Sequence, residues 1–119
     1  MEIAAGLIKV KSGSDETISI WSETIQSRMD EALLTLKDEG VEIESWFELE
    51  IKNEKYLLWY MRAISIEKVW KAFEKSKHEI DHFHLQSMTS ITDKVILTKP
   101  LLDICSSKSA SKVNSNKSV

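Results

Sequence analysis

Residues 41–63 constrain what this chain can fold into more than any other stretch. Between residues 41 and 51, apolar side chains alternate with mostly acidic ones, which is the period of a β-strand that buries one face. A polar turn of Lys, Asn, Glu and Lys at residues 52–55 leads into YLLWYMRA at residues 56–63, a second run rich in aromatic and branched side chains. The two runs predict an antiparallel β-hairpin.

Helical patterns flank this hairpin on both sides. Before it, apolar side chains at spacings of three and four predict one helix that begins near residues 12–14 and ends near Glu39. Gly40 stops that helix, because glycine accepts the left-handed conformation common just past a helix end. After the hairpin, Ser65 can cap a second helix, and a further short helix is predicted through the histidines.

Two more strands, at residues 4–11 and 95–105, complete the set, the last with an irregularity at Pro100. The order strand, helix, strand, strand, helix, short helix, strand predicts an α+β fold of the ferredoxin-like type, a four-stranded antiparallel sheet with helices on one face. We expect one such domain over residues 1–105. Residues 106–119 are rich in Ser, Lys and Asn and predict a disordered tail.

Charge and cysteine content exclude several classes of protein. The net charge is -3, and the tail carries three lysines and no acid, so the body is more acidic than the whole chain. An acidic body argues against nucleic acid as a partner. The single cysteine, Cys105, excludes an internal disulfide, and no run of about 18 apolar residues predicts a membrane span. We therefore expect a cytoplasmic protein with no membrane partner.

Helices are expected on only one face of the sheet, which leaves the side chains of the other face exposed to solvent. We expect this open face to present Lys9, Trp46, Glu48 and Glu50, together with either Tyr56, Tyr60 and Arg62 or Leu57, Trp59 and Met61, according to the strand register. Aromatic side chains on an open sheet favour a homodimer in which two sheets pack face to face. Each subunit would then keep a cleft between sheet and helices for a small-molecule ligand.

Three phrases of the sequence resemble an uncharacterised family of small bacterial domains of unknown function. They are SRMDEALLTLKDEGVEIESWF at residues 27–47, YLLWYMRA at residues 56–63, and FEKSKHEID with His84 at residues 73–84. The last phrase carries the family pattern at Ser76, His78, Ile80, Asp81 and His84, with Glu79 where the pattern has proline. More broadly, residues 6–105 resemble the dimeric α/β-barrel superfamily, which includes small sugar mutarotases and cofactor-free monooxygenases. The resemblance implies the fold and the dimer and assigns no activity.

All three histidines lie within seven residues, interleaved with an aspartate. A histidine can transfer protons near neutral pH, so His78 with Asp81 or His84 is a candidate acid–base pair for an isomerase or a cofactor-free monooxygenase. The alternative is structural, because Asp81 in a first helical turn stabilises that turn.

A metal site is a weaker alternative at the same stretch. On a continuous helix His78, Asp81 and His82 share a face, and two nitrogens with a carboxylate can bind zinc or iron. A helix interrupted near Glu79 would separate them. We expect no metal and no other cofactor.

Four further residues are candidates for binding a ligand. Arg28 and Arg62 could pair with an anionic group, Tyr60 could stack on a ring, and Glu48 could point into the cleft. No glycine-rich phosphate loop or nucleophile elbow is present. The sequence therefore favours a homodimer that binds a small polar molecule, and leaves open an enzyme and a non-catalytic interaction module.

Overall fold

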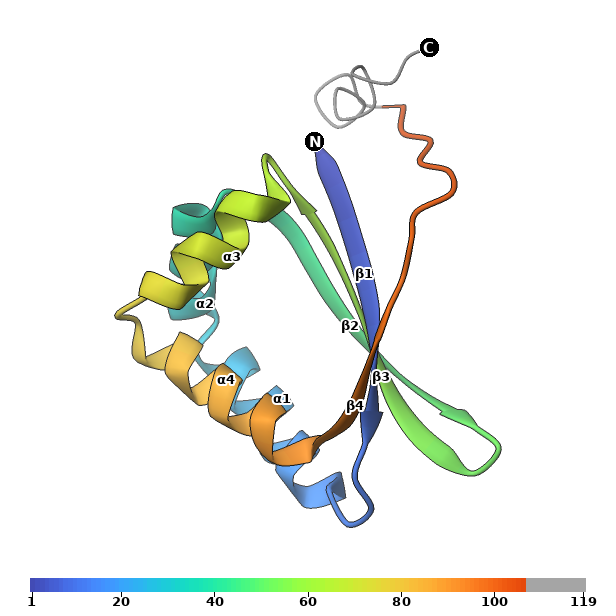
Figure 1. Cartoon of the computed structure of the whole chain (residues 1–119). Coiled ribbons are helices and arrows are strands. Elements are labelled where there is room, and N and C mark those ends of the chain that lie inside the picture. The colour runs from blue at the N-terminus through green and yellow to red at the C-terminus, as the bar shows by residue number, and fades with distance from the viewer. Residues whose placement is uncertain (107–119) are drawn as a thin grey trace.

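The computed structural model describes residues 1–106, and their elements follow the predicted order except that the first predicted helix is divided in two (Figure 1). The elements are β1 (Glu2–Val10), α1 (Asp15–Ser27), α2 (Met29–Glu39), β2 (Val41–Ile51), β3 (Glu54–Ala63), α3 (Ile66–Lys75), α4 (Glu79–Ile91) and β4 (Thr92–Leu97). Residues 107–119, which hold nearly all of the predicted tail, lie outside the described residues. No helix of residues 1–106 is long and apolar enough to cross a membrane.

The four strands form one antiparallel sheet in the order β2-β3-β1-β4. All four helices lie on one side of this twisted sheet (Figure 1). Helix α1 contacts α4, and α2 contacts α3, so the helices form two pairs over the sheet. The order and directions of the strands are those of the ferredoxin-like fold, and they confirm this part of the prediction.

Buried side chains form two clusters between the sheet and the helices. The first joins β1, β3, α1 and α4 around Ile8, Leu57 and Ile91. The second joins β2, β3 and α3 around Met61 and Val69. The half-buried Trp59 packs against both clusters. Burial of these apolar side chains is the main stabilising contribution of the helix layer.

The strand register brings three residues into one row across the sheet. Trp46 on β2 lies opposite Trp59 on β3, which in turn lies opposite Gly6 on β1. A Cβ atom added to Gly6 would lie 2.8 Å from three ring atoms of Trp59, far inside van der Waals contact. The glycine therefore leaves room for the indole ring to lie over β1.

The first helical region is interrupted, contrary to the prediction of one continuous helix. Helix α1 ends at Ser27, and α2 begins at Met29 after Arg28, whose backbone angles are φ -117° and ψ 39°. The hydroxyl of Ser27 donates a 2.8 Å hydrogen bond to the carbonyl of Thr24. A serine that bonds back to the preceding turn bends a helix. The break lets α2 turn a new face towards the sheet.

The last strand is shorter than predicted and begins earlier. Strand β4 pairs with β1 from Thr92 to Leu97, directly after α4, and not over residues 95–105. Residues 98–106 of the described chain form no helix or strand, although the hydroxyl of Thr98 still donates to the carbonyl of Ala5. Pro100 has no amide hydrogen with which to continue the ladder.

The two faces of β2 are the reverse of the prediction. Trp46 and Glu44 point to the helices, whereas Phe47 and Ile43 lie on the open face. A register irregularity between Val41 and Ile43 lets Val41 stay buried at the start of the strand. An extra residue of this kind changes the phase of the alternation. On β3, the open face carries Tyr56, Leu58, Tyr60 and Arg62.

We expect Gly6→Ala to destabilise the protein, because the added methyl group must displace the ring of Trp59. The loss should be about 1–3 kcal/mol, as for other overpacked sites, and should outweigh the gain from restricting the unfolded chain. Chemical denaturation measures it. Ala5→Ser, which adds one atom on the open face of the same strand, is the matched control and should change little. An unchanged stability of Gly6→Ala would contradict this role of Gly6.

Candidate functional site

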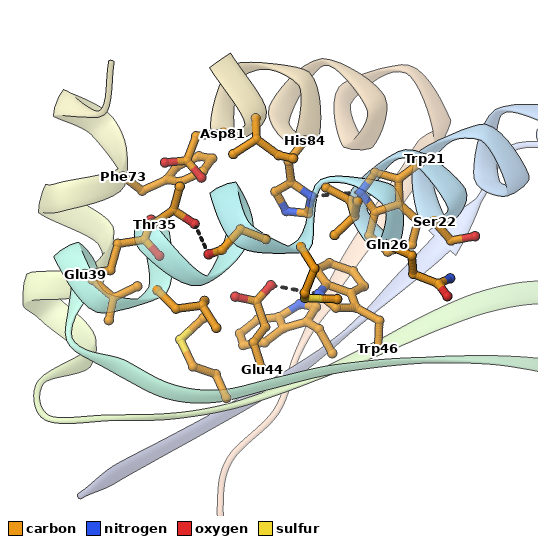
Figure 2. A pocket seen from close by; sticks show the side chains of 18 of the residues that line it. Trp21, Ser22, Gln26, Thr35, Glu39, Glu44, Trp46, Phe73, Asp81 and His84 are labelled. Atoms are coloured by element: carbon orange, nitrogen blue, oxygen red, sulfur yellow. Dashed lines mark hydrogen bonds between the residues drawn. The ribbon is translucent and has the colours of Figure 1, made fainter. Parts of the chain in front are cut away.

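A pocket of about 480 Å³ lies between the sheet and the helices, bordered by side chains of both buried clusters. All four tryptophans of the chain line it, from α1, β2, β3 and α3: Trp21, Trp46, Trp59 and Trp70. Figure 2 shows the polar residues among them, with Glu39, Glu44, Asp81 and His84 on facing walls. Pockets that are mostly apolar with a few converging polar groups are typical of small-molecule sites.

His84 is held in one neutral form by its neighbours. The indole Nε1 of Trp21 donates a 2.9 Å hydrogen bond to Nδ1 of His84. That nitrogen must accept, so the proton of the neutral ring lies on Nε2. Burial lowers the pKa of His84 and outweighs the nearby carboxylates of Glu44 and Asp81, which raise it. At neutral pH His84 therefore offers an Nε2–H donor, which has no partner among the described residues.

Two of the three pocket carboxylates have donors of their own. The indole of Trp46 donates to Glu44 at 2.8 Å. The hydroxyl of Ser76 donates to Asp81 at 2.5 Å. These bonds fix both acids in position and partly offset the cost of their burial.

Glu39 differs from the other two acids. It is only 8% exposed, and its carboxyl has no hydrogen bond or ion pair within residues 1–106. Burial, together with the negative charges of Asp81, Glu44 and Asp38, raises the pKa of Glu39 to about 8. Its carboxyl is therefore mainly protonated at neutral pH and can act as a hydrogen-bond donor.

The predicted histidine and aspartate residues are only partly brought together. Asp81 and His84 share the pocket, whereas His78 lies at the N-terminal cap of α4 with its Nε2 2.7 Å from Asp38. The ring of His82 bonds to the backbone carbonyl of Ser76 at 2.9 Å. His78 lines a smaller adjoining hollow of about 240 Å³. His78 and His84 thus lie in different hollows.

The three residues considered as metal ligands in the sequence are also engaged in other hydrogen bonds. The ring of His78 bonds to Asp38, whereas Asp81 and His82 bond to the hydroxyl and the carbonyl of Ser76. The helix begins only at Glu79, and His78 has an extended backbone. Over residues 1–106, no group of three or more His, Cys, Asp or Glu side chains is arranged to hold a metal ion.

The four predicted ligand-binding residues lie outside the pocket. Arg28 pairs with Glu31 at 2.6 Å on the helix surface, and Glu48 pairs with Lys55 at 3.3 Å near the hairpin turn. Tyr60 and Arg62 lie on the opposite face of the sheet, where Arg62 pairs with Asp103 at 2.5 Å. Because side chains alternate along a strand, neither residue can reach the helix side.

Sequence reasoning missed Glu39, Glu44 and the convergence of the four tryptophans. Glu39 read as the last residue of a helix, and Glu44 read as part of a solvated strand face. One feature of the sequence did indicate this arrangement: Trp46 occupies a position on the side of β2 that otherwise carries glutamates. A large ring at that position indicates that this face, too, is partly buried.

A family model described as "Family of unknown function (DUF6176)" matches residues 1–106. The chain belongs to this family. One similar solved structure is a Bacillus cereus protein assigned to the antibiotic biosynthesis monooxygenases. It is 20% identical, with a TM-score of 0.42 over 86% of this chain and 96% of that chain. No curated protein matches this chain significantly.

We expect the contribution of Glu39 to the stability of this DUF6176 domain to fall as the pH rises from about 5 to 8. The unfolded chain releases the proton of Glu39 near its ordinary pKa of 4.5, whereas the folded chain keeps it up to about 8. Glu39→Gln, which cannot ionise, should make the free energy of unfolding flatter over this range. Denaturation at several pH values measures both slopes. The exposed Glu42→Gln on β2 is the control, and an identical slope for Glu39→Gln and wild type would contradict the burial effect.

Proposed function

We propose that this domain binds a small molecule in the pocket between the sheet and the helices. The observation that carries the proposal is the convergence of four tryptophans, three carboxyl groups and a neutral histidine on one pocket of about 480 Å³. The aromatic walls suit an apolar body, and the polar groups suit one or two hydrogen-bonding groups of a ligand.

A purely structural role explains this arrangement poorly. A hollow of this size leaves its lining without packing partners, and such cavities lower the stability of a core. Glu39 adds to that cost, since it is only 8% exposed and the charges of Asp81 and Glu44 oppose its ionisation. A ligand in the pocket would lower both of these energetic costs and would stabilise the folded protein.

Acid–base catalysis by an isomerase or a cofactor-free oxygenase is a second candidate. What favours it is that Glu39 holds a proton while His84 is neutral in the same pocket. Two groups whose pKa values are shifted in opposite directions are typical of acid–base sites. In this candidate Asp81 and His84 act from the pocket, and His78, which lines the adjoining hollow, is not the partner of His84.

We expect Ala32→Phe to weaken ligand binding strongly, because Ala32 lines the pocket and a phenyl ring would fill part of it. A panel of small aromatic amines, alcohols and acids can be screened by tryptophan emission, since all four indoles line the site. Ligands that quench wild type and raise its melting temperature should lose at least about tenfold in affinity for the variant. Leu34→Phe, at an exposed position of the same helix, should bind as wild type does. Equal binding by Ala32→Phe would place the ligand elsewhere.

We propose further that the open face of the sheet forms a homodimer. Within residues 1–106 no helix covers this face, and it carries Ile43, Phe47 and Ile51, which are 42%, 54% and 43% exposed. Leu58 and Tyr60 on β3 and Leu7 on β1 extend the apolar surface in register. A second copy of the same chain provides a matching apolar face, because a twofold interface uses the same patch on both subunits.

The segment after β4 adds to the surface that a second copy would cover. Figure 1 shows residues 98–105 running without regular structure on the side of the sheet away from the helices. The ion pair between Arg62 and Asp103 holds the segment on the open side. Leu101, Leu102 and Ile104 are 92%, 76% and 81% exposed there. Apolar side chains so exposed on a fixed segment are typical of residues that contact a partner.

We expect wild type to be a dimer at micromolar concentration and Phe47→Lys to be a monomer, because two lysines would then be brought into an apolar interface. Analytical ultracentrifugation measures the mass. Leu33→Lys, a change of the same kind at a residue of α2 that is 54% exposed, is the control and should remain a dimer. A monomeric wild type would refute the dimer proposal and leave the pocket proposal untouched.

A further inference from the structure

The pocket is lined by acids without a basic partner. Glu39, Glu44 and Asp81 come from α2, β2 and α4, and the negative charges of Asp81 and Glu44 both act on Glu39. Among the described residues that line the pocket there is no lysine or arginine. His84 does not supply the missing charge, because its Nδ1 accepts from Trp21 and its ring is neutral. Gathering three acids without a cation raises the energy of the pocket.

The spacing of these acids does not suit a metal ion. They stand on separate elements around the pocket, and no metal-binding group is formed within residues 1–106. A cation that fits must therefore fill more space than an ion and have an apolar body. The walls meet that requirement, because all four tryptophans line the pocket. The rings of Trp59 and Trp70 pack edge to face with their centroids 5.9 Å apart, and those of Trp21 and Trp46 with their centroids 5.2 Å apart. Aromatic faces also attract organic cations directly.

We propose that the ligand of this pocket is an organic cation, namely an amine or alkylated ammonium group carried on an aromatic or aliphatic body. The inference rests on the proposed ligand-binding function and specifies its ligand class. The ammonium group lies near Glu39, Glu44 and Asp81, and the body packs against the tryptophans. Glu39 is its principal partner, because it is 8% exposed and has no other partner within residues 1–106.

Binding of the cation displaces the proton from Glu39. The carboxyl faces Asp81 on α4, Glu44 on β2 and Asp38 on its own helix, and all three favour its protonated form. Glu39 also lines the adjoining hollow, where the basic residues are Lys75, Lys77 and His78. Of these, His78 is paired with Asp38. An ammonium group at the acids reverses the balance and favours the carboxylate. The proton then leaves to the solvent, so binding and proton release are linked.

Three probes of the same shape test the ligand class on the full chain: phenylbutylamine, phenylbutanol and phenylbutanoate. We expect the amine to bind at least about tenfold tighter than the other two, since only it gains the charge and ring interactions. Calorimetry near pH 7 in buffers of different ionisation enthalpy should show release of about one proton per bound amine. Glu39→Gln should lose the proton release and most of the preference, whereas Glu42→Gln, outside the pocket, should retain both.

Each result decides a separate question. If the alcohol or the acid binds as tightly as the amine, the cation inference is refuted and the binding pocket stands. If none of the probes binds, both proposals are overturned. A preference for the amine that survives Glu39→Gln unchanged, without proton release in wild type, would overturn the assignment of Glu39 as partner of the ammonium group.

Discussion

The pairing of Trp46 with Trp59 across β2 and β3, above Gly6 on β1, is the contact on which the rest of the structure depends. Glycine at this point of β1 leaves room for the Trp59 ring, because a Cβ atom there would lie 2.8 Å from three of its ring atoms. Trp46 then meets His84 at 5.5 Å between ring centres, which joins the sheet to α4. Two tryptophans in register thus line the pocket from the sheet side and pack against the buried cluster beneath the helices.

The polar chemistry of the pocket follows from this packing. Two indole N–H groups are used as donors, from Trp21 to His84 and from Trp46 to Glu44. The tryptophans therefore build the walls and also orient the ionisable groups. Glu39 receives no such donor within the described chain, and its raised pKa reflects burial beside other acids. A pocket that is apolar by area is consequently acidic in its electrostatics, and this combination underlies the ligand class that we infer.

The hairpin serves two surfaces at once. Its helix side carries the tryptophan pair, and its open side carries Phe47, Leu58 and Tyr60. Most antiparallel sheets leave one face to water, and their strands alternate clearly between apolar and polar side chains. Here both faces hold large apolar groups, which is what a strand buried on both sides requires. The pocket and the proposed dimer are thus opposite sides of one structural element.

From the sequence alone, the order of elements, the hairpin, the stop at Gly40 and the ferredoxin-like sheet could be predicted, because local periodicity and turn chemistry determine them. Asp81 and His84, which a short motif singled out, both line the pocket. The phase of β2 was wrong, since an irregularity beside Ile43 moves every later side chain to the other face. The break at Arg28, the separation of His78 from His84 and the meeting of Glu39 with Glu44 depend on contacts between elements distant in the chain. Only tertiary packing sets these distances, because no local pattern records which faces of two elements meet.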